Sequence, residues 1–237
     1  MNTATVKIAA PDILYKDPYI VVCRKPVGLS SQPTAMGQAN LLDVLKEQEP
    51  DTGLVHRLDT LTGGVMVYAT RAKQALGNLC ASVQDHRVFV KEYLAVTDCL
   101  PTPSSGELQD RLYHDAHLNK SFVVKGERKG SKAASLVYRA LDTASDGLSL
   151  VHIRLFTGRT HQIRVQFGSR GWPLCGDGKY GSRNNNRCRC ALWSYRISFP
   201  HPVSGERVTF DCLPDASEFP WSLFSTDVYE NIMNFNE

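Results

Sequence analysis

Long apolar runs are absent from this sequence, and so is a leader with an apolar core. No uninterrupted hydrophobic stretch approaches the ~20 residues that a transmembrane helix requires. Residues 1–7 lack the apolar centre of a secretory signal peptide. We therefore expect a cytoplasmic protein that does not bind a membrane.

The sequence also lacks a Cys-x-x-Cys pair. Its seven cysteines are an odd number scattered over 237 residues, which does not fit the disulfide framework of a secreted domain. Four residues could in principle ligate zinc: Cys175, Cys188, Cys190 and His201. Because no Cys-x-x-Cys pair supports such a site, we predict free thiols in a reducing compartment and no bound metal.

Charge of one sign does not dominate. The formal net charge is +3, which neither requires nor excludes a nucleic-acid partner, because local clustering decides. Basic residues gather in two segments, one with Arg183, Arg187 and Arg189 and the other with Lys120, Lys125, Arg128, Lys129 and Lys132. Each segment could contact phosphates or could be a solvated loop.

Short apolar runs rich in valine, isoleucine and aromatic residues favour strands over most of the chain. They cover residues 13–15, 20–23, 65–69, 88–96, 121–124, 135–141, 148–155, 191–199 and 208–212. Helical spacing of apolar residues predicts three helices, at 41–48, 71–84 and 161–168, the last with Thr160 as its N-cap. Many strands with few helices predict an α+β fold with a mostly antiparallel sheet.

The motif His-Arg-Leu-Asp at residues 56–59 is the most informative part of the sequence. It runs into the turn Thr-Leu-Thr-Gly-Gly at 60–64 and then into the apolar stretch 65–69. This order places the carboxylate of Asp59 on a tight loop at the mouth of a buried strand, where a backbone can approach a ligand closely. Asp59 could be a nucleophile or a base, or it could cap the turn; the motif alone leaves both open.

Three further segments accompany this motif. They are Arg-Lys-Pro-Val-Gly-Leu at 24–29, Lys-Glu-Tyr-Leu-Ala-Val at 91–96 and Gly-Arg-Thr-His-Gln-Ile-Arg-Val at 158–165, the last followed by Gly-Asp at 176–177 and Tyr-Gly at 180–181. In content and order, the four segments resemble the motifs of the RluA-type pseudouridine synthase family. The resemblance extends over nearly the whole chain.

The resemblance implies an RNA pseudouridine synthase, an isomerase that breaks the bond between C1′ and N1 of uridine, turns the uracil and rejoins it through C5. This reaction involves no redox change and requires no cofactor. The family fold is a mixed sheet with flanking helices and a central active-site cleft. By resemblance, Asp59 is the nucleophile at C1′ or the base at C2′, Tyr93 stacks on the uracil, and the Arg164 guanidinium pairs with the aspartate.

The resemblance also implies how RNA is held. The target uridine must be flipped out of its stem, and Arg57 would fill the vacated space. Four further residues are expected to contact RNA: Lys25, Arg24, Arg159 and His161. His56, which is also expected near the RNA, is more suited to ordering the loop that carries Asp59. The substrate would be a stem-loop of transfer or ribosomal RNA. The sequence does not indicate an oligomeric state, so a monomer is the default expectation.

The matched segments predict one catalytic domain over residues 10–220 and a C-terminal tail over 221–237. Some family members carry a separate N-terminal RNA-binding domain. Few residues precede the first matched strand here, so we expect no such domain. The catalytic domain itself, or a partner, must then bind the RNA.

The sequence departs from the family pattern at three places. Gly63 replaces the usual serine of the turn, which should add backbone freedom. Trp193 stands where a histidine is frequent, so altered packing or altered RNA contact is expected. Segment 182–190 carries an unusual cluster of arginine, asparagine and cysteine, and it is either a substrate-specific loop or a flexible one.

Other enzyme classes fit the motifs poorly. A kinase would require another residue order, Asp-Phe-Gly and a glycine-rich phosphate loop. A zinc deaminase would require His-x-Glu with Pro-Cys-x-x-Cys, and a glycosidase two carboxylates. The remaining alternative is an RNA-binding or RNA-folding protein with the same fold and little activity. The joint presence of Asp59, Tyr93 and Arg164 favours the enzyme, because a purely structural relative has no chemical reason to keep all three.

Overall fold

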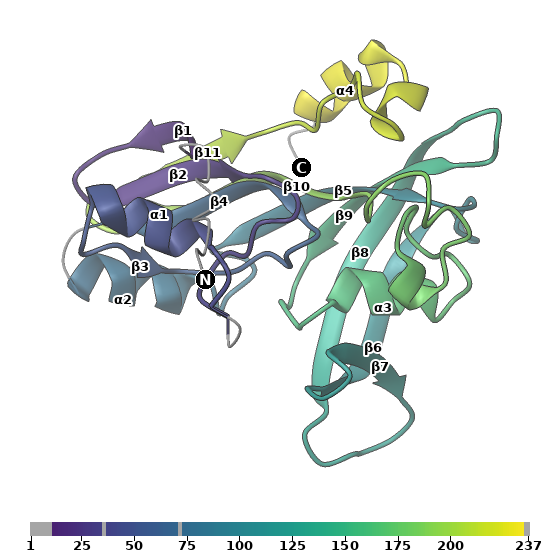
Figure 1. Ribbon diagram of the computed structural model, residues 1–237, viewed down its shortest axis with the longest axis horizontal. Helices are drawn as coiled ribbons and strands as arrows, with labels where there is room; N and C mark the ends of the chain where they lie inside the picture. The colour runs from purple at the N-terminus through teal and green to yellow at the C-terminus, as the bar shows by residue number, and fades with distance from the viewer. Residues whose placement is uncertain (1–10, 35–36, 71–72, 235–237) are drawn as a thin grey trace, which may run out of the picture.

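One large sheet forms the centre of the protein in the computed structural model, which describes residues 11–34, 37–70 and 73–234 (Figure 1). Its strands in this part of the chain are β1 (Asp12–Lys16), β2 (Ile20–Lys25), β3 (Gly53–Leu54), β4 (Gly63–Ala69), β5 (Val90–Thr97), β6 (Ser105–Asp115), β7 (Lys120–Val124), β8 (Lys132–Thr143), β9 (Ser149–Leu155), β10 (Leu192–Pro200) and β11 (Arg207–Asp211). The order is β1-β2-β4-β10-β5-β9-β8-β6-β7, with β11 beside β10 and β3 beside β4. Every pairing among these strands is antiparallel except that of β4 with β10.

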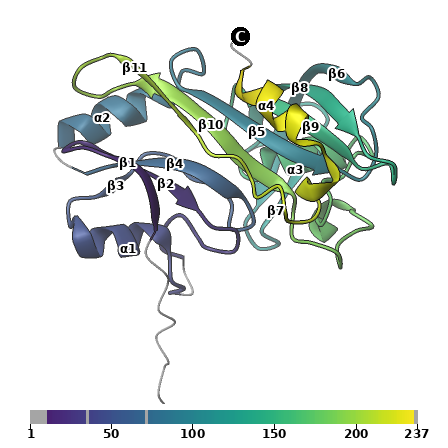
Figure 2. The ribbon, with the colours of Figure 1, turned by 90° about the horizontal axis from the view of Figure 1, so that it is seen from above.

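Helices lie on both faces of the sheet, which confirms the predicted α+β fold. Within the described residues they are α1 (Leu41–Gln48), α2 (Lys73–Ser82), α3 (Gln162–Gly168) and α4 (Thr226–Met233), and Figure 2 shows α1 and α2 on opposite sides. Because strand side chains alternate between faces, Val21 and Cys23 of β2 share a core with α1, whereas Ile20 and Val22 share one with α2. In the described residues, no helix is both long enough and apolar enough to cross a bilayer.

The periodic patterns located the long elements well. The helix expected at 41–48 is α1, and that expected at 71–84 is α2, although residues 71 and 72 lie outside the described part. The helix expected at 161–168 is α3, but Thr160 is not its N-cap. His161 takes that position with a left-handed φ of 55°, and the Thr160 carbonyl instead accepts a hydrogen bond from Ser121 Oγ at 2.6 Å.

Strand β6 was not predicted, because its sequence is mostly polar. Only Leu108 is fully buried in its first half and only Leu112 in its second. The strand forms because β7 and β8 pair with it on either side, so tertiary pairing overrides local propensity. Figure 1 shows β6, β7 and the adjoining end of β8 extending away from the rest of the sheet.

The described part of the segment expected as a C-terminal tail is folded against the sheet. Trp221, Phe224, Tyr229 and Ile232 are buried in a core that they share with Leu94 of β5 and other sheet residues. The Tyr229 hydroxyl donates to the Trp221 carbonyl at 2.8 Å, which fixes α4 to the turn before it. Because Tyr229 and Ile232 are three residues apart, both face the sheet from one side of α4.

The two positions that were expected to depart from the family pattern, Gly63 and Trp193, pack against each other. Gly63 and Trp193 are partners across the parallel pairing of β4 with β10. A Cβ atom added to Gly63 would lie 2.3 Å from a ring carbon of Trp193 and 2.9 Å from a methyl carbon of Val27. The expectation that Gly63 loosens the turn is therefore wrong: the residue is buried at the start of β4, and the indole fills the space of the missing side chain.

We expect Gly63→Ser to destabilise the protein by about 1–3 kcal/mol, because the new side chain overpacks a filled site. Combining it with Trp193→His should cost less than the sum of the two single changes, since the smaller ring makes room for the serine. Urea unfolding of the wild type, both single variants and the double variant measures this coupling. Strictly additive losses would show that the two positions do not compensate.

Candidate active site

The structure brings Asp59, Tyr93 and Arg164 together near the middle of the sheet. Asp59 lies in the loop before β4, Tyr93 in β5 and Arg164 in α3. A pocket of about 340 Å³ is lined by Asp59, Arg164, His161 and Arg57 together with residues of the 30–34 loop. A smaller adjoining pocket shares these four residues and adds Tyr93. The two pockets form a single cleft with the Asp59 carboxylate at its boundary.

Three residues of the 25–31 segment hold the loop that carries Asp59: Ser31, Gly28 and Lys25. Ser31 Oγ donates to the Leu58 carbonyl at 2.9 Å and accepts from the Leu58 N–H at 3.1 Å. The Gly28 N–H donates to the Thr60 carbonyl at 2.7 Å. The loop also closes on itself, since the Thr62 N–H donates to the Asp59 carbonyl at 2.9 Å. Asp59 is thus presented on a rigid turn, which suits a reacting group.

Lys25 is the third support and is not available to RNA. Its side chain is 0% exposed, and its ammonium donates to the carbonyls of Pro26, Leu29 and Thr60 at 2.9, 2.7 and 3.4 Å. Burial lowers the pKa of Lys25 to about 7, against the opposing effect of the Asp59 charge. The expectation that Lys25 contacts RNA is wrong, because all three of its donors hold the loops that frame the site.

His56 has a similar structural role. Its Nε2 accepts a hydrogen bond from the Val67 N–H at 3.2 Å, and its ring packs edge-on against Phe89. Burial, together with the nearby Lys91 charge, lowers its pKa to about 3. This neutral imidazole orders the loop and offers no charge to a phosphate.

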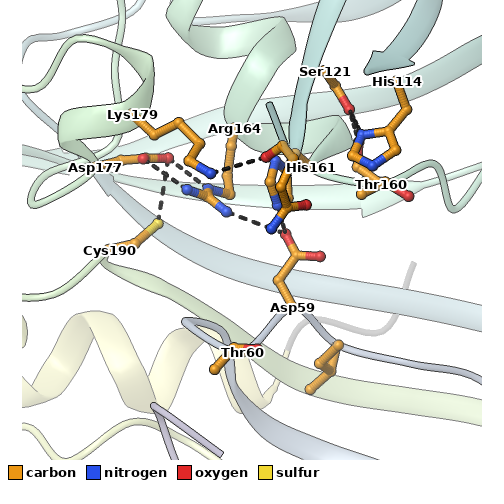
Figure 3. A network of polar contacts seen from close by, with 12 residues as sticks. Asp59, Thr60, His114, Ser121, Thr160, His161, Arg164, Asp177, Lys179 and Cys190 are labelled. Carbon is orange, nitrogen blue, oxygen red and sulfur yellow. Dashed lines mark hydrogen bonds and ion pairs between the residues drawn. The ribbon is translucent and has the colours of Figure 1, made fainter. Parts of the chain in front are cut away.

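Arg164 lies between two carboxylates (Figure 3). Its Nε and Nη2 donate to the two oxygens of Asp177 at 2.6 and 2.8 Å, and its Nη1 reaches Asp59 Oδ2 at 3.5 Å. Arg164 and Asp177 are 3% and 1% exposed. Burial acts to lower the pKa of Arg164, but the hydrogen bonds that it donates to Asp177 and the charges of both carboxylates outweigh burial and raise that pKa. The guanidinium therefore stays charged beside Asp59.

Asp177 is the functional residue whose role sequence reasoning missed. The Gly-Asp pair at 176–177 belonged to the matched motifs, but nothing in its spacing indicates that it grips Arg164. Its two-pronged hydrogen bonds fix the plane of the guanidinium, and the Cys190 thiol adds a contact at 3.7 Å. Asp177 consequently orients the cation that faces Asp59.

His161 faces the same carboxylate from the other side. Its Nε2 lies 3.8 Å from Asp59 Oδ2, and its Nδ1 is 2.9 Å from the Tyr180 hydroxyl, which accepts from the Ser121 N–H at 2.8 Å. The ring is 8% exposed and lines both pockets. Its position suits ordering of Asp59 at least as well as the RNA contact expected from the sequence.

Tyr93 forms part of the floor of the smaller pocket. Its side chain is 5% exposed and belongs to the same core as Ile163 and Phe167 of α3. Burial first, and the Asp59 charge second, raise the pKa of Tyr93, so the phenol is neutral. An aromatic ring at this place can stack on a base that enters the pocket.

The three remaining arginines occupy different surroundings. Arg57 is exposed at the rim of both pockets and pairs with none of the described acidic residues. Arg159 lines the smaller pocket, and its Nε donates to the Ala133 carbonyl at 2.9 Å. Arg24 points elsewhere, since it lies on β2, pairs with Asp12 at 2.5 Å and lines neither pocket. The RNA contact expected of Arg24 therefore stays a prediction.

The four potential zinc ligands do not converge. His201 Nε2 contacts Asp17 Oδ2 at 2.8 Å, whereas Cys175 and Cys188 contact each other. In the described ranges, no three histidine, cysteine or acidic side chains are grouped so as to hold a metal ion.

His161 should make the folded protein less stable in acid. Burial lowers its pKa to about 4 from the ordinary 6.5, although Asp59 opposes this. An unfolded chain protonates histidine near pH 6.5, so between pH 6.5 and 4 it binds more protons than the folded state. The free energy of unfolding therefore falls as the pH is lowered through this window, by up to about 1.4 kcal/mol per pH unit for this residue.

The His161→Asn variant tests this dependence, because asparagine tolerates a left-handed φ and does not titrate. Urea unfolding at pH 7 and pH 5 should show a smaller loss of stability in the variant than in the wild type. The exposed His117→Asn change serves as a control and should leave the loss unaltered. Equal losses in wild type and His161→Asn would contradict the prediction.

Comparison with known proteins agrees with this geometry. The family model described as RNA pseudouridylate synthase matches residues 19–169. Ribosomal large subunit pseudouridine synthase D of Neisseria meningitidis serogroup A is 35% identical over 227 residues, which cover 87% of this chain and 59% of that protein. This chain thus spans about three fifths of the length of that relative.

Two solved human structures share the fold. Human RNA pseudouridylate synthase domain containing 4 superposes with a TM-score of 0.67 at 26% identity, over 86% of this chain and 89% of that one. Human RNA pseudouridylate synthase domain containing 1 gives a TM-score of 0.74 over 95% of each chain, and at 22% identity it supports the fold alone. The resemblance read from the motifs is confirmed, and the chain belongs to the RNA pseudouridylate synthase family.

Proposed function

We propose that this protein converts specific uridines of structured RNA to pseudouridine, with Asp59 as the reacting carboxylate. The observation that carries the proposal is the position of Asp59. It lies at the boundary of a cleft, on a turn fixed by Ser31 and Lys25, and faces the buried guanidinium of Arg164 at 3.5 Å. Membership of the family supports the same chemistry.

Three residues of the cleft have distinct roles in this reaction: Arg164, Asp59 and Tyr93. Arg164 places a fixed positive charge 3.5 Å from the Asp59 carboxylate. The Asp59 carboxylate either attacks C1′ of the flipped uridine or removes the proton from C2′, and in both cases the C1′–N1 bond breaks. The neutral ring of Tyr93 stacks on the released uracil while it turns and rejoins through C5. The reaction conserves all atoms and electrons and draws on no cofactor.

The basic surface around the cleft supports an RNA stem-loop as substrate. Arg57 at the rim is placed to enter the space left by a flipped base. Lys179 also lines the larger pocket and donates to the Asn119 carbonyl at 2.9 Å, which holds the turn between β6 and β7 beside the cleft. The basic residues 120–132 lie on β7, on the loop after it and at the start of β8, where they can follow the phosphate backbone.

We further propose transfer RNA or ribosomal RNA as the substrate, acted on in the cytoplasm by a monomer with one catalytic domain over residues 10–220. The ribosomal name of the Neisseria relative supports ribosomal RNA and the location. The single sheet that contains every strand from β1 to β11 supports one domain.

Tritium release from RNA labelled at uracil C5 tests the proposal directly. Unmodified transcripts of transfer RNA and of ribosomal stem-loops are incubated with the protein, and the released label and the pseudouridine content of nuclease digests are measured. Release with matching pseudouridine from one pool supports the proposal and identifies the substrate class. Tight RNA binding without release from either pool would favour an RNA-binding or RNA-folding protein instead.

A further inference from the structure

Two cysteine thiols meet next to the active site but outside its cleft. The sulfur atoms of Cys175 and Cys188 are 3.5 Å apart. Cys175 is fully buried, whereas Cys188 is partly exposed and lines a separate pocket of about 350 Å³ with Arg187, Arg189 and Trp193. A small oxidant can therefore reach Cys188, and a second thiol lies directly behind it.

The environment of the pair distinguishes the two sulfurs. A hydrogen bond joins the two sulfur atoms, and either of them can donate it. When Cys188 accepts this bond, its pKa is lowered even though burial acts in the opposite direction. The same hydrogen bond, followed by burial, raises the pKa of Cys175. Cys188 is thus the sulfur that ionises first, and the thiolate is the reactive form of cysteine. An accessible thiolate next to a second thiol is the usual arrangement of oxidisable cysteines.

We propose that Cys175 and Cys188 are an oxidative modification site that forms a disulfide when the protein meets a hydroperoxide. The Cys188 thiolate attacks the peroxide, an S–O bond forms, the O–O bond breaks, and the leaving oxygen takes a proton to give an alcohol or water. The Cys175 sulfur then attacks the Cys188 sulfur, the S–S bond forms, and the S–O bond breaks. The Cys175 proton leaves with the hydroxide as water. Two thiols lose two electrons, and one peroxide gains them.

We expect formation of this disulfide to change the position of Arg164. A disulfide requires a sulfur separation of about 2.05 Å, so the two sulfurs must approach from 3.5 Å, by rotation of the side chains and by shifts of the backbone. The two segments are already in close contact, because a Cβ atom on Gly176 would lie 2.4 Å from the Arg189 carbonyl oxygen. Asp177 is two residues from Cys175 and holds the guanidinium, so we expect a backbone shift at Cys175 to displace Arg164. Only this effect on turnover rests on the proposed function; the disulfide does not.

The chemical test uses the intact protein, reduced and then exposed to a stoichiometric amount of hydrogen peroxide. Thiol titration in denaturant should show the seven thiols reduced by two, and peptide mapping should find Cys175 linked to Cys188. Thiol loss in Cys188→Ser should be at least about tenfold slower, because the reactive thiolate is missing. The matched control Cys99→Ser removes another partly exposed thiol and should behave like the wild type.

The functional test measures uridine isomerisation before oxidation, after oxidation and after reduction with a dithiol. The wild type should lose most of its turnover and regain it on reduction, while Cys188→Ser should resist. A mapped bond between other cysteines, or equal thiol loss in wild type and Cys188→Ser, would overturn the proposal. If neither RNA pool is modified at all, peptide mapping of the Cys175–Cys188 disulfide still tests the proposed modification site without any activity assay. Should Cys188→Ser fail to fold, mapping and its reversal in the wild type provide the same answer.

Discussion

Asp59→Asn should abolish uridine isomerisation, with turnover at least about 10³-fold below the wild type. Asparagine keeps the size of the side chain and can still accept a hydrogen bond, but it can neither attack C1′ nor remove a proton from C2′. The cleft should keep its shape, because Asp177 holds Arg164 with two hydrogen bonds that do not involve Asp59. Single-turnover tritium release, with the protein in excess over RNA, measures the chemical step.

RNA binding provides the necessary comparison. Asp59→Asn should bind the substrate at least as tightly as the wild type, because the change removes a negative charge from a site that receives a polyanion. Asp51→Asn, an exposed change in the preceding loop, is the matched control for charge and should retain full turnover. If Asp59→Asn released tritium as fast as the wild type, another group would have to perform the reaction.

Asp177→Asn should damage both stability and turnover, although Asp177 does not line the cleft. Removing the Asp177 charge leaves the buried guanidinium with only its 3.5 Å contact to Asp59, which costs up to about 3–5 kcal/mol. The amide can replace only part of the two-pronged contact, so the guanidinium loses its fixed plane. Turnover should fall by about 10²-fold, because a displaced Arg164 no longer holds its positive charge against the reacting side chain of Asp59.

Asp110→Asn is the matched control for this change. Asp110 also pairs with an arginine, Arg170, at 2.9 Å, and the arginine is 28% exposed. Its replacement should cost less stability and leave turnover intact, since this pair does not touch Asp59. Urea unfolding and tritium release at low temperature, where both variants are folded, separate the two effects. Full turnover in folded Asp177→Asn would show that catalysis does not depend on the hydrogen bonds between Arg164 and Asp177.

The sequence was most informative where chemistry restricts residue type. Asp59, Tyr93 and Arg164 were predicted to meet, and they do, although they come from three distant segments. Lys25 was misassigned because lysine is rarely buried, and only the structure reveals the three carbonyls that satisfy its ammonium. The prediction failed there because the loop geometry that supplies those carbonyls leaves no periodic signal.

Contacts between distant segments were equally hidden. Strand β6 has little apolar alternation, so its pairing with β7 and β8 could not be predicted locally. Gly63 and Trp193 were noticed in the sequence as two separate departures from the family pattern. Only the register of β4 against β10 shows that the two residues are neighbours. Asp177 stood in a matched motif, but a motif gives residue type and order, not the partner of a side chain.

The lone parallel pairing of the sheet has a consequence for how family members can diversify. Because β4 and β10 run in the same direction, the segments that enter them arrive at the same edge, one with Asp59 and the other with Asp177. The second segment is tied at its base, where the Ala191 N–H donates to the Cys175 carbonyl at 2.8 Å. Insertions and exchanges between these two ends can therefore accumulate as a variable loop while the reacting groups stay in register. Within that loop, Ser182, Arg183 and Asn184 are all hydrogen-bonded to Asp98, so a change that keeps these contacts would leave the position of Asp177 intact.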